Sequence, residues 1–403
     1  MLPILIYYYF LMGLAGAQIL SQKRASAARR KIVGFKPGLT TAEENQRLLE
    51  EYGIKIKKHL PLANACLCEI DPSVTEAGIL LSDDSIIEFI EDDYVAKIQV
   101  LPSRPVFIRK KGQTLPWGVE KIEAPDAWSR TAGEGVRVGI IDTGIDLSHP
   151  DLKDNIKETF GVLDCKNIED DNGHGTHVAG IIAAVDNNIG VVGVAPKAEI
   201  YSVKAFDKNG RGQVSDIVEA LNWCVEKKVH VINMSFGFSL QSKALERAIQ
   251  EVYRHNIVMV AAAGNTGKDN SVMYPAKYQE VIAVAASDIN DKAASFSSRG
   301  PEIDVIAPGV DIPSTYKGGS YKAMSGTSMA TPHVTGTVAL MLSRSGMNVD
   351  GVKARISSTA RDIGLPREKQ GAGLLNASRA VGSIKKYKGG FHHEQARGAE
   401  EGD

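Results

Sequence analysis

The sequence predicts an α/β protein with a mainly parallel sheet and helices on both faces, preceded by a small α+β domain. Three observations support this class. Short, continuously apolar segments recur from residue 136 onward, as in strands that are buried on both faces. Helical segments lie between several of them, which favours parallel pairing. Before residue 100 segments such as KIVGFKP (31–37) instead alternate apolar and polar residues, which is a strand pattern of a different kind.

The N-terminal elements follow the order β-α-β-β-α-β. KIVGFKP (31–37) alternates as a strand, and TTAEENQRLLEEYG (40–53) has the threonine cap, early acidic residues and closing glycine of a helix. The remaining predicted elements are strands at 54–60 and 65–70, a short helix near Val74–Leu81, and a strand at 86–100. This order is that of a ferredoxin-like domain, which we assign to residues 31–100.

The larger domain is assigned to residues 113–384. Its predicted strands are 136–144, 198–206, 229–237, 257–265, 281–287 and 303–309. Its predicted helices include 174–185, 212–228 and 242–256. In parallel sheets functional side chains gather where the strands end, at the carboxyl edge. We therefore expect the polar residues that close these strands to form the functional site.

The remaining segments are predicted to be processed or unstructured. Residues 2–17 are apolar and end in Ala15-Gly16-Ala17, which is typical of a signal peptide and predicts secretion. Because no Lys or Arg precedes this stretch, an uncleaved membrane anchor or a misassigned start codon stays open as an alternative. We assign 1–17 to the signal peptide, 18–30 and 101–112 to linkers, and 385–403 to a flexible tail. The 101–112 linker, with two prolines at its start and a basic cluster, is predicted to be exposed to proteolysis.

The composition is that of an ordinary globular protein. Hydrophobic residues make up 43% of the chain and charged residues 24%, with a formal net charge of -1, which gives no electrostatic reason to expect a nucleic acid partner. Cys66 and Cys68 are predicted to share one strand face and not to bridge each other. Cys165 and Cys224 could pair in an oxidising compartment, but buried free thiols are the simpler interpretation.

Three motifs supply the parts of a nucleophilic site. Asp142 ends the strand in IIDTG, His174 opens a helix in NGHGTH, and Ser328 lies at a loop-to-helix junction in GTSMATPH. A serine hydroxyl becomes a good nucleophile when an imidazole takes its proton and a carboxylate fixes that imidazole. The order Asp, His, Ser is the order found in subtilisin. The pair His174 and His177 lacks the glutamate of the zinc-protease HExxH pattern, so we do not expect a zinc site.

The segment from about Gln113 to Ala380 resembles the subtilisin-like serine proteases. It contains IIDTGID, HGTHVAG, VINMSFG, AAAGN, SFSSRGPEIDVIAPG and GTSMATPHV in the family's order. The resemblance implies a serine endopeptidase in which Ser328 is the nucleophile, His174 the general base, Asp142 its carboxylate partner and Asn265 a donor to the oxyanion. The preceding domain is similar to the family's propeptide, which implies a self-processing zymogen with an intramolecular inhibitor.

The resemblance also implies where a peptide or protein substrate would bind. Two strand edges would flank an extended substrate and favour broad specificity, because main-chain hydrogen bonds do not depend on the side chains. The residues implied at these edges and in the P1 pocket are Ser235, Phe236, Gly237, Gly210, Arg211, Gly212, Ala263, Gly264 and Met273. Met273 departs from the small residue that the family usually has at the floor of this pocket, which puts the P1 preference in doubt.

VDNNIGVVGVAP (185–196) resembles the family's calcium loop. A structural Ca²⁺ needs six to eight oxygen ligands, which a loop of carbonyl groups can supply. The ligands implied by the match are Gln113, Asp151, Val185, Asn187, Ile189 and Val191. We expect His149, His177 and His333 to have structural roles, and the protein to be a monomer.

The leading interpretation is a secreted, calcium-stabilised serine endopeptidase of broad specificity. One alternative is an inactive homologue that acts as a binding or scaffold protein, against which the intact Asp142, His174, Ser328 and Asn265 argue. A second is a specific processing protease, for which Arg211, Phe236 and Met273 offer no acidic cleft. An intracellular enzyme of the family is less favoured because the pro-region is long and domain-like.

Overall fold

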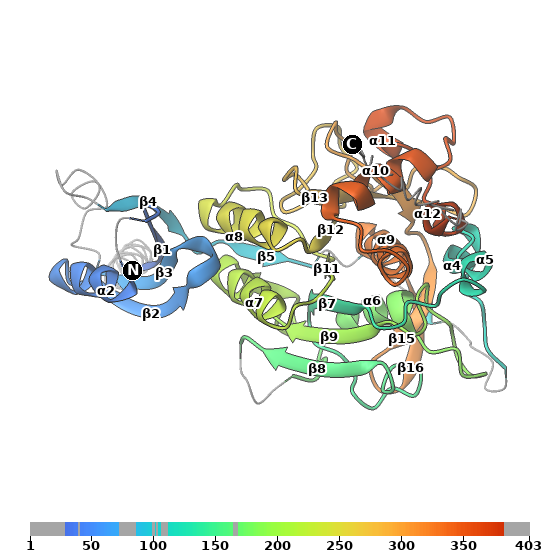
Figure 1. Ribbon diagram of the computed structural model, residues 1–403, viewed down its shortest axis with the longest axis horizontal. Coiled ribbons are helices and arrows are strands. Elements are labelled where there is room, and N and C mark those ends of the chain that lie inside the picture. The colour runs from blue at the N-terminus through green and yellow to red at the C-terminus, as the bar shows by residue number, and fades with distance from the viewer. Residues whose placement is uncertain are drawn as a thin grey trace, which may run out of the picture.

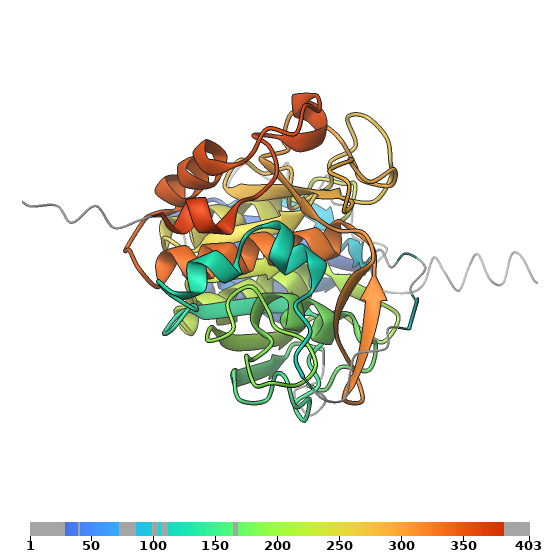
Figure 2. The same cartoon turned by 90° about the vertical axis from the view of Figure 1, so that its right-hand side faces the viewer.

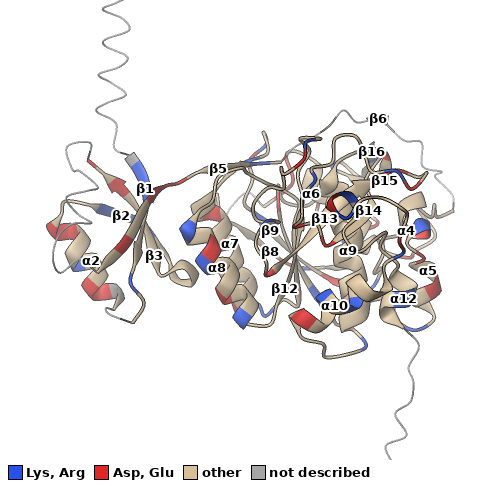
Figure 3. Ribbon diagram, turned by 90° about the horizontal axis from the view of Figure 1, so that it is seen from above, with Lys and Arg blue, Asp and Glu red and all other residues tan. Residues whose placement is uncertain are grey.

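The computed structural model describes residues 29–38, 41–71, 86–98, 101, 104–105, 112–163 and 168–382. These form a small N-terminal lobe and a larger lobe, which Figure 1 shows side by side. The predicted signal peptide, the predicted helix near 74–81, the tail from 385 and Cys165 lie outside the described residues. Lys and Arg are interspersed with Asp and Glu over both lobes (Figure 3), in keeping with the formal net charge of -1.

The N-terminal lobe is an antiparallel sheet with a helix on one face. Its strands, in the order β2-β3-β1-β4, are β1 (Arg29–Phe35), β2 (Lys55–Leu60), β3 (Ala65–Ile70) and β4 (Ile87–Asp92). A short 3-10 turn, η1 (Pro61–Ala63), joins β2 and β3. Helix α2 (Ala42–Glu51) begins with the predicted cap: the Thr41 side chain accepts from the Glu44 amide while the Glu44 side chain accepts from the Thr41 amide. The predicted helix at 40–53 and strands at 31–37, 54–60 and 65–70 are confirmed.

Both faces of this small sheet are apolar. One face forms a core of its own that includes Val33, Phe35 and Leu49 of α2. The other, which includes Ile32, Leu67 and Phe89, joins the core of the larger lobe beneath two of its helices. The larger lobe therefore covers an apolar surface that the N-terminal lobe cannot bury by itself.

The larger lobe is built on a seven-stranded parallel sheet in the order β14-β13-β12-β11-β7-β9-β8. Its strands are β7 (Arg137–Asp142), β8 (Ile156–Gly161), β9 (Glu199–Lys204), β11 (Val231–Met234), β12 (Val258–Ala262), β13 (Val281–Ser287) and β14 (Val305–Pro308). Every residue of β11, β12 and β13 is buried. The predicted fold class and all six predicted strands of this domain are confirmed.

Helices cover both faces of the sheet (Figures 1 and 2). α6 (His174–Ala183) and α9 (Thr327–Leu342) pack on one face, and α7 (Val214–Glu226) and α8 (Lys243–Arg254) on the other. The shorter or peripheral helices are α4 (Trp117–Lys121), α5 (Pro125–Trp128), α10 (Val349–Thr359), α11 (Arg367–Gln370) and α12 (Ala377–Val381). No helix among the described residues is long and apolar enough to cross a membrane.

The strand predicted at 86–100 is wrong as one element. β4 ends at Asp92, and β5 (Val95–Lys97) pairs with β10 (Arg211–Gln213) of the larger lobe instead of the small sheet. The break falls at Asp93, whose carboxylate accepts from the amide and hydroxyl of Ser215 at the start of α7. The chain therefore leaves the small sheet in order to join the larger lobe.

Two further strand features are absent from the sequence prediction. β8 is a half-exposed edge strand with the sequence IKETFG, so it lacks the continuous apolar run of the central strands. β15 (Ile312–Tyr316) and β16 (Ser320–Met324) form a hairpin, and β6 (Arg104–Pro105) pairs with β16. Part of the predicted linker at 101–112 is therefore held against the larger lobe.

The described cysteines are free thiols. Cys66, Cys68 and Cys224 are all buried, and Cys66 does not bridge Cys68, as predicted. Burial disfavours the thiolate, so it raises the pKa of all three and that of Cys66 to about 11. These thiols are therefore protonated at neutral pH.

Candidate active site

The three predicted catalytic side chains come from one strand and from two helices that begin at the carboxyl edge of the sheet. Asp142 is the last residue of β7, His174 the first of α6 and Ser328 the second of α9. Their exposed fractions are 0%, 1% and 3%. His174 Nδ1 lies 2.8 Å from Asp142 Oδ1 and 3.0 Å from Oδ2. A proton on Nδ1 is therefore held by the carboxylate, which leaves Nε2 to act as a base.

The serine hydroxyl is directed elsewhere in this structure. Ser328 Oγ donates to the carbonyl oxygen of Ser235 at 2.9 Å, and the buried His174 Nε2 has no hydrogen-bond partner among the described residues. Contacts between a nucleophile and its base often tighten only when substrate is bound. The geometry therefore holds the imidazole ready, whereas the hydroxyl must leave Ser235 before it can bond to Nε2.

Asn265 is held beside Ser328 by Thr327. Asn265 Oδ1 accepts from both the amide and the hydroxyl of Thr327 at 2.9 Å, so the side-chain amide is fixed in orientation. A methyl group built on Gly326 would lie 3.3 Å from Asn265 Nδ2 and 3.6 Å from the Ser328 amide nitrogen. Both nitrogens therefore border one small space, which is the arrangement that an oxyanion requires. The Thr327 hydroxyl is committed to Asn265.

β5 lies between the two predicted substrate-binding edges. On one side β5 pairs with β10, and the Ile98 amide donates to the Gly210 carbonyl at 2.9 Å. On the other side Lys97 and Gly237 exchange two hydrogen bonds of 3.3 and 3.4 Å. An extended segment of this chain is thus bound through its backbone on both sides.

The side chains of this segment alternate between the cleft and solvent. Ala96, opposite Gly212, and Ile98 are buried, whereas Val95 and Lys97 are exposed. Arg211, on the β10 edge, is also exposed. The cleft therefore contacts every second side chain of the bound segment, as expected for strand addition.

Met273 fills the predicted P1 pocket. A cavity of only about 10 Å³ beside Ser328 is lined by residues that include Phe236, Gly237, Gly264 and Met273. The Met273 sulfur lies 3.2 Å from a methyl group built on Gly237 and 3.0 Å from one built on Gly264. Its amide donates to the carbonyl of Ala263 at 2.9 Å. The thioether therefore occupies the space between the two backbone walls of the pocket.

The residues of the predicted calcium site lie together on one side of the larger lobe. Gln113 Nε2 donates to the carbonyl oxygens of Val185 at 2.6 Å and Val191 at 3.0 Å, so these two oxygens converge on one point. The Asp151 carboxylate, with 0% of the residue exposed, accepts from the Val191 amide and from Asn187 Nδ2. Ile189 belongs to the same loop, where its amide donates to Asn187 Oδ1.

The other buried histidines bond to the backbone. His177 Nε2 lies 3.0 Å from the carbonyl oxygens of both Ile312 and Lys322, and burial lowers the pKa of His177 to about 3. His333 Nδ1 lies 2.8 Å from the Met329 carbonyl, and burial lowers its pKa to about 4.

His149 joins two loop segments through both of its ring nitrogens. Its Nδ1 accepts from the Asp151 amide, which leaves Nε2 to donate to the Ser320 carbonyl at 3.0 Å. These three histidines therefore brace the fold, as the sequence predicts.

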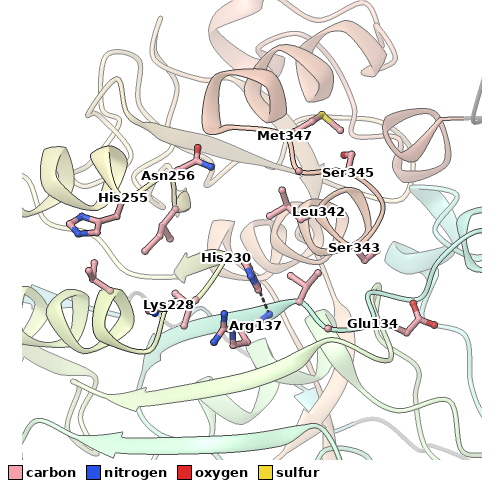
Figure 4. A pocket seen from close by; sticks show the side chains of 16 residues that line it. Glu134, Arg137, Lys228, His230, His255, Asn256, Leu342, Ser343, Ser345 and Met347 are labelled. Carbon is pink, nitrogen blue, oxygen red and sulfur yellow. Dashed lines mark hydrogen bonds between the residues drawn. The ribbon is translucent and has the colours of Figure 1, made fainter. Parts of the chain in front are cut away.

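A larger cavity, of about 710 Å³, lies at the opposite edge of the sheet (Figure 4), where β7, β11 and β12 begin and α7, α8 and α9 end. Its lining includes Arg137, Lys228, His230 and His255. Helix C-termini carry partial negative charge, which basic side chains offset. His230 Nδ1 accepts from the Arg137 amide at 2.9 Å. Volume alone is thus a poor guide here, because the much smaller cavity is the one lined by the predicted catalytic residues Asn265 and Ser328.

Two acidic residues at the interface between the lobes were missed by sequence reasoning. Glu91 accepts from the amides of Lys243 and Ala244 and from the Ser242 hydroxyl at the start of α8, and Asp93 does the same for Ser215 at the start of α7. Carboxylates are favourable at helix N-termini. The sequence signal is the acidic run Glu91-Asp92-Asp93 at the end of β4. Its partners lie more than a hundred residues away in the sequence.

A parallel α/β fold with a buried Asp–His pair, a serine and two N–H groups bordering one small space at a single sheet edge is typical of a serine hydrolase. The strand bound across its cleft through the backbone narrows this to a hydrolase of peptides. The chain belongs to the subtilase family, whose model matches residues 133–378. It is a serine endopeptidase.

The relatives cover most of the chain. It is 38% identical to subtilisin E of Bacillus subtilis over 379 residues, which is 92% of this chain and 95% of the relative. It is 47% identical over 271 residues to a thermostable alkaline protease of Halalkalibacterium halodurans, covering 67% and 74% of the two chains. It is 44% identical over 272 residues to subtilisin BL of Lederbergia lenta, covering 67% and 99%.

Proposed function

We propose that this chain is a secreted endopeptidase of broad specificity that is made as a zymogen and removes its own N-terminal domain. The observation that carries the proposal is the position of β5, which is bound in the cleft as a substrate would be. Under this proposal the signal peptide is 1–17, the propeptide domain 31–100, the processing linker 101–112 and the enzyme 113–384. The apolar run at 2–17 supports secretion.

The proposed mechanism is acyl transfer through Ser328. Its hydroxyl turns from Ser235 to His174 Nε2 and attacks the scissile carbonyl while Nε2 takes the proton. Asp142 stabilises the imidazolium that forms. Asn265 Nδ2 and the Ser328 amide donate to the oxyanion. His174 then returns the proton to the leaving amine, and water hydrolyses the acyl-enzyme by the same steps.

The register of β5 supports a specific processing site. Lys97 lies opposite Gly237 in an antiparallel bridge. In an antiparallel pair, the residue two positions after Lys97 lies opposite the residue two positions before Gly237. A substrate continuing in this register would therefore place its equivalent of residue 99 opposite Ser235. The Ser235 carbonyl is the group that accepts from the Ser328 hydroxyl. We therefore propose cleavage after Gln99, one residue before the end of the proposed propeptide domain and next to the linker at 101–112 that the sequence predicts to be exposed.

The N-terminal lobe is proposed to act as an intramolecular inhibitor. Its strand fills the cleft, and Glu91 and Asp93 bind the N-termini of α8 and α7. Lys58 forms ion pairs with Asp216 and Glu219 on α7, and these carboxylates raise the pKa of Lys58 in spite of its partial burial. After cleavage these contacts would keep the domain bound until it is degraded.

A structural Ca²⁺ is proposed at Gln113, Asp151, Val185, Asn187, Ile189 and Val191. Two observations support the fit: two carbonyl oxygens converge on one point, and the buried Asp151 carboxylate is met by the neutral donors of Val191, Asn187 and Tyr321. Hard oxygen ligands of this kind suit Ca²⁺, which would cross-link the loop to the N-terminal part of the enzyme.

Broad specificity is proposed because the hydrogen bonds that hold β5 between the two edges are made by its backbone. Met273 modifies this expectation at P1. A thioether between Gly237 and Gly264 leaves little room for an aromatic ring but can move aside for an unbranched chain. The enzyme is therefore proposed to accept small and long, flexible P1 side chains better than aromatic ones.

The test is expression of the full chain with Ser328→Ala, with Ser325→Ala as the control from the same motif. The wild type and Ser325→Ala should self-process, and their new N-terminus should be Val100. Ser328→Ala should accumulate as the uncleaved precursor. A serine-directed fluorophosphonate should label the wild type on the peptide that contains Ser328. Self-processing of pure Ser328→Ala at the wild-type rate would refute the assignment of Ser328 as the nucleophile. A wild type that neither self-processes nor takes up the fluorophosphonate would favour a scaffold role.

A further inference from the structure

Thr143 lies directly after Asp142 and is fully buried. Its hydroxyl donates to Asp170 Oδ1 at 2.8 Å and accepts from the amide of Gly175 at 3.0 Å. Gly175 is the residue after His174. The Thr143 hydroxyl thus connects the residue that follows Asp142 to the residue that follows His174.

The backbone of Thr143 is held at both of its polar groups. Its amide donates to Asp142 Oδ1 at 2.8 Å, so it shares that oxygen with His174 Nδ1. Its carbonyl accepts from Lys204 Nζ at 2.7 Å. The Lys204 side chain is only 4% exposed, and its ammonium also binds Asp171. Thr143 is therefore fixed in position, and its hydroxyl has a defined direction.

Asp170 extends the connection into the first turn of α6. Its Oδ1 also accepts from the amides of Asn172 and Gly173, and its Oδ2 accepts from the amide and hydroxyl of Thr176. The carboxylate thereby holds the residues on either side of His174. Because Thr143 Oγ1 donates to this carboxylate, the end of β7 and the start of α6 are joined through a single buried hydroxyl.

We propose that the Thr143 hydroxyl is a positioning group that sets the Asp142–His174 distance, and that it acts on turnover through His174 without touching substrate. The proposal rests on the proposed roles of Asp142 and His174. Valine has nearly the shape of threonine but neither bonds Asp170 nor accepts from Gly175. Without the hydroxyl the Gly175 amide stays buried and unpaired, so α6 must shift to find a partner.

The experiment compares Thr143→Val and Thr143→Ser with the wild-type full chain after activation, using one peptide substrate. Loss of the two bonds should lower kcat about 10- to 100-fold in Thr143→Val while KM stays within about twofold, because the substrate edges are untouched. Thr143→Ser, which keeps the hydroxyl, should recover to within about threefold of wild type. Thr143→Cys, with a weak donor of similar size, should fall between them.

The pH profile separates positioning from a merely structural role. The charged groups around the imidazole are Asp142, Asp170, and Lys204 with Asp171, and none is changed by these substitutions. Two further titratable groups lie near His174: His177 on the same helix, and Tyr316, whose hydroxyl donates to the Asn172 carbonyl. A longer Asp142–His174 contact stabilises the imidazolium less, so the acid limb of kcat/KM should move to lower pH in Thr143→Val and return in Thr143→Ser.

Two outcomes would overturn the proposal. One is a Thr143→Val enzyme with wild-type kcat and acid limb, even if its melting temperature falls. The other is Thr143→Ser or Thr143→Cys as impaired as Thr143→Val, which would assign the effect to packing. If Thr143→Val does not fold, the comparison of Thr143→Ser with Thr143→Cys still decides. Peptidase activity that survives Ser328→Ala would instead refute the proposed function. That result does not depend on the Thr143 variants, so the two failures can be distinguished.

Discussion

Replacing Met273 by glycine should open the P1 pocket to aromatic side chains. Carbon atoms in contact lie about 3.5–4.0 Å apart. The Met273 sulfur is already 3.0 and 3.2 Å from methyl groups built on Gly264 and Gly237, so no ring fits beside it. Full burial of a phenylalanine side chain is worth about 1.5–3 kcal/mol. Since 1.36 kcal/mol is a tenfold change in rate, kcat/KM for a P1 phenylalanine substrate should rise about 10- to 150-fold.

The assay is hydrolysis of a peptide series that differs only at P1, with Phe, Leu, Gln and Ala. Met273→Leu is the matched control, because it conserves volume and should leave the ratio of Phe to Gln within about threefold of wild type. Activity on the alanine peptide should change little, since a methyl group does not reach the floor. An unchanged ratio of Phe to Ala in Met273→Gly would show that another group closes the pocket.

Three further predictions follow from the contacts above. Glu91→Ala removes a carboxylate that accepts from three donors at the start of α8. The loss of about 2 kcal/mol of binding free energy should raise the inhibition constant of the cleaved N-terminal domain about 30-fold. An unchanged inhibition constant would contradict the proposed role of Glu91 in the interface. Calcium at about a hundred times its Kd should raise the melting temperature by about 5–10 °C, and Asp151→Ala should abolish this increase. An equal increase in the variant would show that calcium does not bind at the proposed site. His177 and His333, with pKa values of about 3 and 4, are neutral in the folded state, whereas the unfolded chain protonates them near pH 6.5. Each should therefore cost up to about 1.4 kcal/mol of stability per pH unit as the pH falls below 6.5, which urea unfolding of Ser328→Ala between pH 7 and 4.5 would detect as a fall in the free energy of unfolding.

Local sequence accounts for most of the central architecture. The buried strands carry their own signal, because a strand covered on both faces must be apolar throughout, as in β12 and β13. The capped helix α2 carries its start signal in Thr41 and Glu44. β8 was missed because an edge strand has one side open to solvent, so polar residues are tolerated there. The helix expected near 74–81 lies outside the described residues.

The chemical groups of the candidate site were likewise readable from the sequence, since each of Asp142, His174, Ser328 and Asn265 stands in a short motif at the end of a predicted element. What the sequence could not supply is the set of partners. The Ser328 hydroxyl bonds to Ser235, 93 residues away, and the Met273 sulfur stands between two glycine walls.

By itself, then, the sequence determined the fold class and the order of the buried strands along the chain, and it supplied the candidate reactive groups, because apolar runs and short motifs are local properties. Only the tertiary structure decided that β5 leaves the small sheet for the cleft, that Glu91 meets the start of α8, and that Thr143 joins the ends of β7 and α6. Those contacts connect residues up to about 150 positions apart. They depend on how the layers pack, and a linear pattern carries no record of which distant donor will meet which acceptor.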